Sequence, residues 1–138
     1  SVIIIGAILT VMMFTLSTSS FLSRFDALAG ENKEASAALA SGCVAVAELK
    51  LTEDPAYLPA LGGDCISLGG ACGGADPQKV CKICQVVTVS GQSTILTRAL
   101  YHGSYTNLAV TGALGVGSFA VSNWSELPTY IGSACAIP

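Results

Sequence analysis

The sequence predicts an α+β fold in which one long N-terminal helix precedes a small antiparallel β-sheet. Three observations predict this fold: an uncharged stretch at the N-terminus, an apolar stripe with helical spacing after it, and β-branched segments separated by turn residues in the second half. The length of 138 residues fits one domain better than two. We expect a hydrophobic helix at 1–23, an amphipathic helix at 24–53, and a head at 54–138 made of a loop and the sheet.

The first stretch has the length and composition of a membrane-crossing helix. Residues 1–23 hold no charged side chain, and Arg24 is the first. At 1.5 Å per residue this stretch makes about 35 Å of helix, which is enough to cross the hydrocarbon core of a bilayer. The chain starts with Ser1 rather than Met, so either a leader was removed or the sequence is a fragment, and we favour leader removal. The alternative is a plain membrane anchor or an uncleaved signal sequence.

The helical pattern continues beyond the uncharged stretch. Apolar residues from Phe21 to Leu49 recur at steps of three and four, as on one face of an amphipathic helix. No proline occurs before Pro55, and the residue before a proline is disfavoured in helical conformation. One helix of about 50 residues is therefore predicted to stop at 52–55. The four consecutive hydroxyl residues at 17–20 are expected to weaken it locally.

The second half of the sequence predicts a loop followed by strands. Residues 56–77 are glycine-rich and predict a loop with one short strand around 65–67. Turn residues at 91–92 and 102–104 separate β-branched segments, which predicts an antiparallel meander. The predicted strands are 84–90, 93–101 and 105–111, with a further edge strand at 116–121. The tail, 123–138, is expected to be irregular and held through Cys135.

The composition excludes several functional classes. Charged residues make up 11% of the chain and hydrophobic residues 51%, whereas soluble domains average about 25% charged residues. This balance argues against both a disordered chain and a typical cytosolic enzyme. A net charge of -3 argues against a nucleic-acid partner, which requires a basic surface. His102 is the only histidine, and no catalytic constellation is visible, so we expect neither an enzyme nor a cofactor.

The cysteines predict a disulfide framework outside the cell. An even number of cysteines beside a membrane-targeting segment favours structural disulfides. We expect Cys43 to pair with Cys65 and so join the helix to the loop, and Cys72 with Cys81 and Cys84 with Cys135 for the remainder. The six cysteines are Cys43, Cys65, Cys72, Cys81, Cys84 and Cys135.

Two other readings of the cysteines stay open at this point. Cys81 and Cys84 have the spacing of a redox pair, although they lead into a predicted strand and not into a helix. Together with Cys65 and Cys72 they could hold zinc, although the first spacing is irregular. Separately, Asn123-Trp124-Ser125 matches the acceptor pattern for N-glycosylation.

Several segments resemble the type IV pilin family, most closely the pilin-like proteins of small-genome candidate-phylum bacteria. The similar segments are 40–51, 54–57, 63–65 and 90–95. In architecture the resemblance covers the whole chain: a processed hydrophobic N-terminus, a long helix, a loop and a sheet. One departure concerns position five of the mature chain, where the family has an acidic residue and this sequence has Ile5.

The resemblance implies a structural subunit made as a precursor. A prepilin peptidase would cleave it before Ser1, residues 1–23 would hold it in the membrane, and the pilus assembly machinery would move it into a helical homopolymer at the cell surface. Such a filament serves adhesion or twitching motility. The alternatives are a minor pilin or secretion-system pseudopilin, which Ile5 favours, and a membrane-anchored extracellular binding domain. The expected filament-core residues are Val2, Ile3, Ile4, Ile5, Ile8, Leu9, Val11, Met12 and Phe14.

Overall fold

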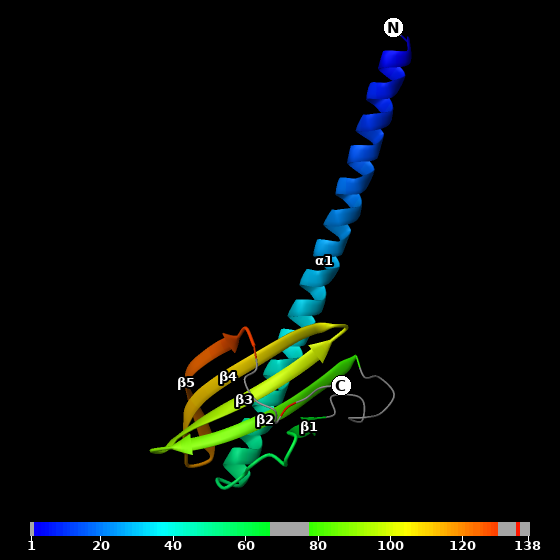
Figure 1. Ribbon diagram of the computed structural model, residues 1–138. Coiled ribbons are helices and arrows are strands. Elements are labelled where there is room, and N and C mark those ends of the chain that lie inside the picture. Colours follow the sequence, from blue (N-terminus) through cyan, green and yellow to red (C-terminus); the bar gives the residue numbers. More distant parts are fainter. Residues whose placement is uncertain (1, 67–77, 130–134, 136–138) are drawn as a thin grey trace. The chain divides into compact units, whose positions relative to one another are not determined.

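The computed structural model describes residues 2–66, 78–129 and 135 (Figure 1). The chain divides into two compact units, Ser1–Glu31 and Asn32–Pro138. The second unit, which includes the end of the helix as well as the predicted head at 54–138, is called the head from here on. Helix α1 (Val2–Glu53) contributes to both, with residues 32–53 belonging to the second unit. Within residues 2–22 the described side chains are those of Ile4, Ile5, Ile8, Met12 and Met13.

The backbone of α1 is helical without interruption from its first turn to its last. It remains helical through the hydroxyl residues at 17–20. It ends at Glu53, where the Asp54 N–H still donates to the Lys50 carbonyl oxygen at 2.8 Å. The Asp54 side chain then accepts the Ala56 N–H at 2.9 Å, which turns the chain at Pro55. The prediction that the helix stops just before Pro55 is confirmed.

The sheet is an antiparallel meander with strand order β1-β2-β3-β4-β5. Two of its hairpins turn on residue pairs with positive φ, Ser90-Gly91 and His102-Gly103. Such pairs match the right-handed twist of the flanking strands. Gln92 and Ser104, predicted to lie in turns, instead begin strands. The strands are β1 (Asp64–Ile66), β2 (Lys79–Val89), β3 (Gln92–Tyr101), β4 (Ser104–Gly115) and β5 (Ser118–Leu127).

Three strands extend clearly further than the sequence pattern predicts. β2 begins at Lys79, five residues before the predicted start at Cys84. β4 continues to Gly115, beyond the predicted end at residue 111. The predicted edge strand at 116–121 is wrong at its start, because residues 116 and 117 form the turn that leads into β5. The expectation of an irregular tail from Asn123 is wrong as far as Leu127, because β5 pairs with β4 up to the contact of Leu127 with Asn107. Asn, Ser and Glu have weak strand propensity, and pairing with a long neighbour overrides it here. The predicted loop at 67–77 and the end of the tail lie outside the described residues.

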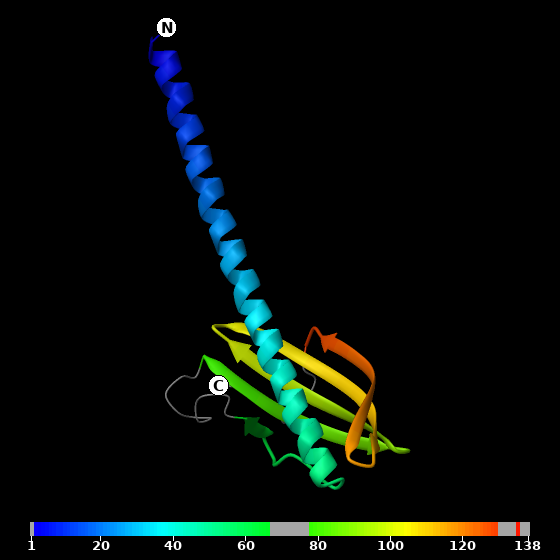
Figure 2. The ribbon, with the colours of Figure 1, turned by 180° about the vertical axis from the view of Figure 1, so that it is seen from behind.

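The second unit has one core between α1 and a single face of the sheet (Figure 2). Alanines at the helix–sheet contact keep side chains short where the two layers meet, so that Leu51, Ile83 and Ile95 can interdigitate fully buried. The predicted class, α+β with a long N-terminal helix packed on a small antiparallel sheet and stapled by disulfides, is confirmed. The core cluster consists of Ala40, Cys43, Val44, Ala47, Leu51, Cys81, Ile83, Val86, Ile95, Ala99, Leu108 and Val110.

A β-bulge at Cys84 shifts the alternation of the β2 side chains between the two faces of the sheet. Ile83 pairs with Thr97 and Gln85 with Leu96, so Cys84 has no partner of its own on β3. The extra residue lets Ile83 and Val86 both reach the core, although an odd number of steps separates them. Cys84 is buried but does not belong to that core cluster.

Candidate functional site

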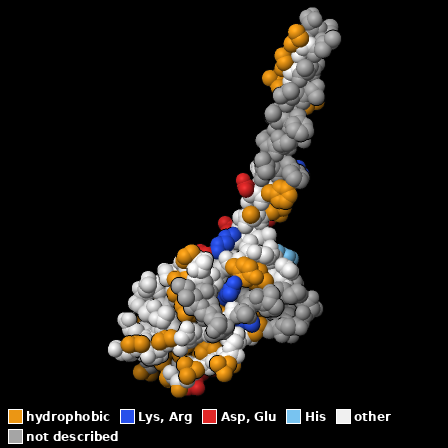
Figure 3. Space-filling model, in the orientation of Figure 1, with side chains coloured by type: hydrophobic (Ala, Val, Ile, Leu, Met, Phe, Trp, Pro, Cys, Tyr) orange, Lys and Arg blue, Asp and Glu red, His pale blue; other side chains and the backbone are white. Residues whose placement is uncertain are grey.

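The first unit presents an apolar helix surface, defined here by the described side chains of Ile4, Ile5, Ile8, Met12 and Met13. These side chains are between 52% and 73% exposed. Ile4, Ile8 and Met12 follow one another at steps of four and therefore lie along one stripe of α1. In Figure 3 the described side chains of this segment are hydrophobic. A continuous apolar stripe with this exposure is typical of a surface that lipid or another protein covers.

The structure describes only part of the predicted filament-core set. Ile4, Ile5, Ile8 and Met12 belong to the apolar helix surface. Ser1 and the side chains of Val2, Ile3, Leu9, Val11 and Phe14 lie outside the described ones, so their predicted roles stay predictions.

The N-terminal helix is a candidate membrane span or secretion signal. Among the described residues, the stretch Ser23–Glu53 is long and apolar enough to cross a membrane, and 33% of its most apolar window is buried. That burial arises in the head, where the helix contributes to the core from Ala40 onward. Residues 23–30, by contrast, are all exposed, including Phe25 and Leu28.

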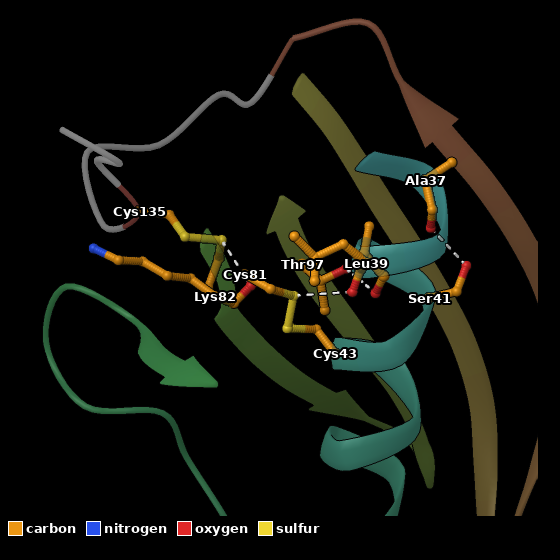
Figure 4. The surroundings of a disulfide bond; sticks show 10 residues. Ala37, Leu39, Ser41, Cys43, Cys81, Lys82, Thr97 and Cys135 are labelled. Atoms are coloured by element: carbon orange, nitrogen blue, oxygen red, sulfur yellow. Dashed lines mark hydrogen bonds between the residues drawn. A yellow bond between two sulfur atoms is a disulfide. The ribbon is translucent and has the colours of Figure 1, made fainter. Parts of the chain in front are cut away.

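One disulfide ties α1 to the sheet. Cys43 of α1 bonds to Cys81 of β2, with a Cα–Cα distance of 6.3 Å, and both residues are buried (Figure 4). The Cys81 sulfur also lies 3.2 Å from the Leu39 carbonyl oxygen. The predicted pairs Cys43–Cys65 and Cys72–Cys81 are therefore wrong. The physical reason is that α1 lies across the sheet, so that Cys43 faces β2 and not the loop that follows the helix.

A second disulfide holds the C-terminal segment. Cys84 bonds to Cys135, with a Cα–Cα distance of 5.2 Å, as predicted. The Arg98 guanidinium donates to the Cys135 carbonyl oxygen at 3.3 Å and lies over the Tyr105 ring, 4.7 Å from its centroid. Cys65 is disulfide-bonded as well, and the other half of that bond lies outside the described residues.

These disulfides exclude the two other interpretations of the cysteines, a redox pair and a zinc site. Cys81 and Cys84 belong to different disulfides, so they do not form a redox pair with each other and are not available as thiolate ligands for zinc. The described residues contain no cluster of His, Cys, Asp and Glu suited to a metal ion. Disulfides of this kind indicate an oxidising environment outside the cytosol.

A polar cluster binds α1 to the sheet where the head begins, and no sequence pattern predicted it. The Lys33 ammonium donates to the Tyr105 carbonyl oxygen at 2.8 Å and to the Thr106 hydroxyl at 3.0 Å, and it forms a salt bridge with Glu126. The hydroxyls of Ser36 and Thr106, both fully buried, are 2.6 Å apart. Helix α1 is thus bound to β4 and β5 within two residues of the boundary between the units.

A second cluster closes the loop after the helix. The Asp64 carboxylate accepts the Tyr57 hydroxyl at 2.5 Å, the Lys50 ammonium at 3.1 Å and the Ala60 N–H at 2.9 Å. The Tyr57 hydrogen bond contributes most to lowering the pKa of Asp64, followed by the Ala60 N–H and Lys50. Burial, with the bond to Asp64 and its charge, raises the pKa of Tyr57. This cluster therefore fixes the loop between α1 and β1.

Comparisons with protein-family models, curated proteins and solved structures gave no match.

The remaining predicted residues lie on the surface of the head. His102 occupies the β3–β4 turn with φ of 44°, next to the Tyr101 ring at 4.6 Å between centroids. Asn123 and Trp124 lie on β5, the last strand of the described sheet, and both are exposed. The apolar helix surface, and not these head residues, carries the functional proposal.

Proposed function

We propose that this chain is a structural subunit, a pilin, of a type IV pilus-like extracellular filament that polymerises through its N-terminal helix and serves adhesion or twitching motility. The observation that carries the proposal is the apolar helix surface. Its described side chains are more than half exposed and are joined to a head that has its own core. The α1 residues of the core begin at Ala40, so the core does not cover these exposed apolar side chains. Lipid or another protein must therefore cover them.

Two surroundings meet this requirement in turn. In the membrane, Ile4, Ile8 and Met12 contact lipid, and in the filament they contact the same helix of neighbouring copies. The transfer replaces one apolar surrounding by another, so it carries no large hydrophobic cost. A contact between different surfaces of identical copies, repeated without closure, generates a helical filament. Cleavage of the precursor by a prepilin peptidase and transfer by the pilus assembly machinery belong to this proposal.

The head has properties that suit the outside of such a filament. Its disulfides, Cys43–Cys81 and Cys84–Cys135, hold the helix and the C-terminal segment to the sheet. The polar cluster around Lys33 holds α1 where the head begins. The head therefore stays folded when the N-terminal helix changes its surroundings.

Electron microscopy of filaments sheared from the cell surface, with mass spectrometry of their subunit, tests the proposal. A matched pair of variants sharpens it. Ile8→Lys places a charge on the apolar helix surface, and Leu61→Lys places one on the head, where Leu61 is fully exposed. We expect Leu61→Lys to appear in sheared filaments as the native chain does. We expect Ile8→Lys to stay in the membrane fraction, because its lysine reaches the lipid interface but is buried without a partner in a filament.

Other outcomes of the same experiment favour the alternatives. With cleavage directly before Ser1, which is part of this proposal, Ile5 would stand where the family carries the acid that pairs with a neighbour's terminal amine, and this favours a minor pilin or secretion-system pseudopilin. A chain found in filaments at only a small fraction of another subunit supports that role. A chain found only in detergent-extracted membranes contradicts the filament and supports a membrane-anchored extracellular binding domain.

A further inference from the structure

The motif Asn123-Trp124-Ser125 lies on β5, the terminal strand of the described sheet. We propose that Asn123 is an N-glycosylation acceptor and that its glycan shields the β5 edge of the described sheet. The proposal does not depend on polymerisation, since a secreted monomer and a filament subunit would carry the same modification.

Asn123 is the accessible one of the two asparagines on the sheet. Its side chain is exposed, and no hydrogen bond of that side chain occurs among the described residues. On the strand it faces Thr111 of β4, and no described strand follows on its other side. Asn107, by comparison, is 7% exposed and its amide donates to the Leu127 carbonyl oxygen at 3.4 Å. Only Asn123 therefore offers its amide nitrogen to an enzyme.

The hydroxyl that the acceptor pattern requires lies on the same side of the strand. Side chains two residues apart on a strand point to the same face, so Ser125 and Asn123 are presented together. Ser125 donates to the Ala109 carbonyl oxygen at 3.4 Å, which is a long bond that an approaching enzyme can replace. The asparagine and the hydroxyl of the acceptor pattern are therefore accessible together to a glycosylating enzyme.

β5 lacks two of the common protections of an edge strand, lysine and proline. Such strands commonly carry lysine or proline, which prevents pairing with other chains. The ten residues of β5 contain neither, and the one charge, Glu126, is bound to Lys33. Val121 and Trp124 are 46% and 47% exposed on this strand. The bulge at Ser122 gives some protection, and a glycan on the next residue would sterically block the remaining edge.

The disulfides indicate that the head matures in an oxidising environment outside the cytosol, which is where oligosaccharides are transferred to asparagine from lipid carriers. In the transfer the Asn123 amide nitrogen attacks the anomeric carbon of a lipid-diphosphate-linked oligosaccharide. A bond forms between this nitrogen and the anomeric carbon, and the bond from that carbon to the diphosphate oxygen breaks. The nitrogen loses one proton, and the lipid diphosphate leaves. No oxidant or reductant is required.

Intact-mass measurement of the protein isolated from the cells that secrete it tests the proposal, before and after treatment with an amidase that releases N-linked glycans. We expect a mass above that of the oxidised chain, removed by the amidase with conversion of Asn123 to aspartate. Asn123→Gln and Ser125→Ala should abolish the additional mass. Ser125→Thr, which keeps the pattern, and Ser122→Ala, which lies outside it, should retain it.

Two results would overturn the proposal: a native mass equal to that of the unmodified oxidised chain, or additional mass that persists in Ser125→Ala. The Ser125→Thr variant distinguishes loss of the acceptor pattern from misfolding, because both substitutions remove the same serine and only one removes the hydroxyl. The amount of secreted protein is compared across all four variants.

Discussion

At the scale of single residues, polar side chains in the head stabilise the positions at which α1 begins and ends its contact with the sheet. Lys33 binds β4 and β5 near the boundary of the two units, and Lys50 binds Asp64 of β1 near the end of the helix. Lys33 and Glu126 are nearly half exposed, so their salt bridge alone contributes little. The buried hydroxyl pair of Ser36 and Thr106 makes the contact specific.

The Asp64 cluster makes the stability of the head depend on pH. Because hydrogen bonds from Tyr57, Ala60 and Lys50 lower the pKa of Asp64 in the folded state, the folded protein favours the carboxylate. The resulting stabilisation is present above the unfolded pKa of about 4 and is lost as the pH falls through the lower folded pKa. We expect Asp64→Asn to cost about 1 kcal/mol of unfolding free energy at neutral pH and to flatten its decline in acid.

Denaturant unfolding of the detergent-solubilised protein between pH 2 and 7 measures this effect. Glu53→Gln is the matched control, because Glu53 is exposed and carries the same charge close by. A Glu53→Gln profile that flattens as much as that of Asp64→Asn would show that net charge, and not the cluster, controls the acid decline.

At the scale of elements, the two described disulfides have different roles. Cys43–Cys81 crosses from α1 to β2 through the core, with both residues at most 1% exposed. Cys84–Cys135 joins β2 to the C-terminal segment outside that core cluster. The loops that they close, with separations of 38 and 51 residues, predict similar entropic contributions of about 4 kcal/mol each.

The double substitution of Cys43 and Cys81 by alanine is therefore expected to destabilise the head more than that of Cys84 and Cys135. Both remove a cross-link and two buried side chains, but only Cys43 and Cys81 belong to the core cluster between α1 and the sheet. Loss of their sulfur atoms from that close-packed cluster is expected to add about 1–2 kcal/mol. Denaturant unfolding of both double variants measures the difference. If both double variants lost the same unfolding free energy, the proposed difference between the Cys43–Cys81 and Cys84–Cys135 disulfides would be contradicted.

The elements that sequence predicted well are those with strong local signals. The helix end depends on Pro55, and two hairpins depend on glycines at 91 and 103, so these boundaries could be found from neighbouring residues alone. The Cys43–Cys81 pair depends instead on how α1 crosses the sheet, and no local pattern contains that. The Cys84 bulge and the extension of β5 to Leu127 depend on partner strands in the same way.

In the candidate site, too, the features with a local sequence signal were predicted and those that depend on long-range contacts were not. The apolar composition of residues 1–23 is a local property, and it led to the apolar helix surface. The cluster of Lys33, Ser36, Thr106 and Glu126 unites residues about 70 to 90 positions apart, each of which is ordinary in its own segment. In the sequence, only the position of Lys33, shortly after the uncharged stretch, pointed toward this cluster.

At the scale of the whole molecule, the core of the head does not depend on the first unit. Its α1 members begin at Ala40, and the described residues 23–30 are all exposed. The polar contacts of Lys33 with Tyr105, Thr106 and Glu126 also lie within the second unit. The head therefore contains the groups that fold it, while the apolar helix surface determines where the chain resides and what it joins.

A chain that begins at Asn32 is accordingly expected to be a soluble, folded monomer. Removing residues 1–31 takes away the apolar helix surface and leaves the core, the two described disulfides and both polar clusters intact. Gel filtration without detergent should show a monomer, and its thermal midpoint should lie within a few degrees of that of the full chain in detergent. A truncated chain that aggregates or unfolds at much lower temperature would show that the first unit supports the fold of the head. The proposed separation of a polymerising helix from a self-sufficient head would then fail.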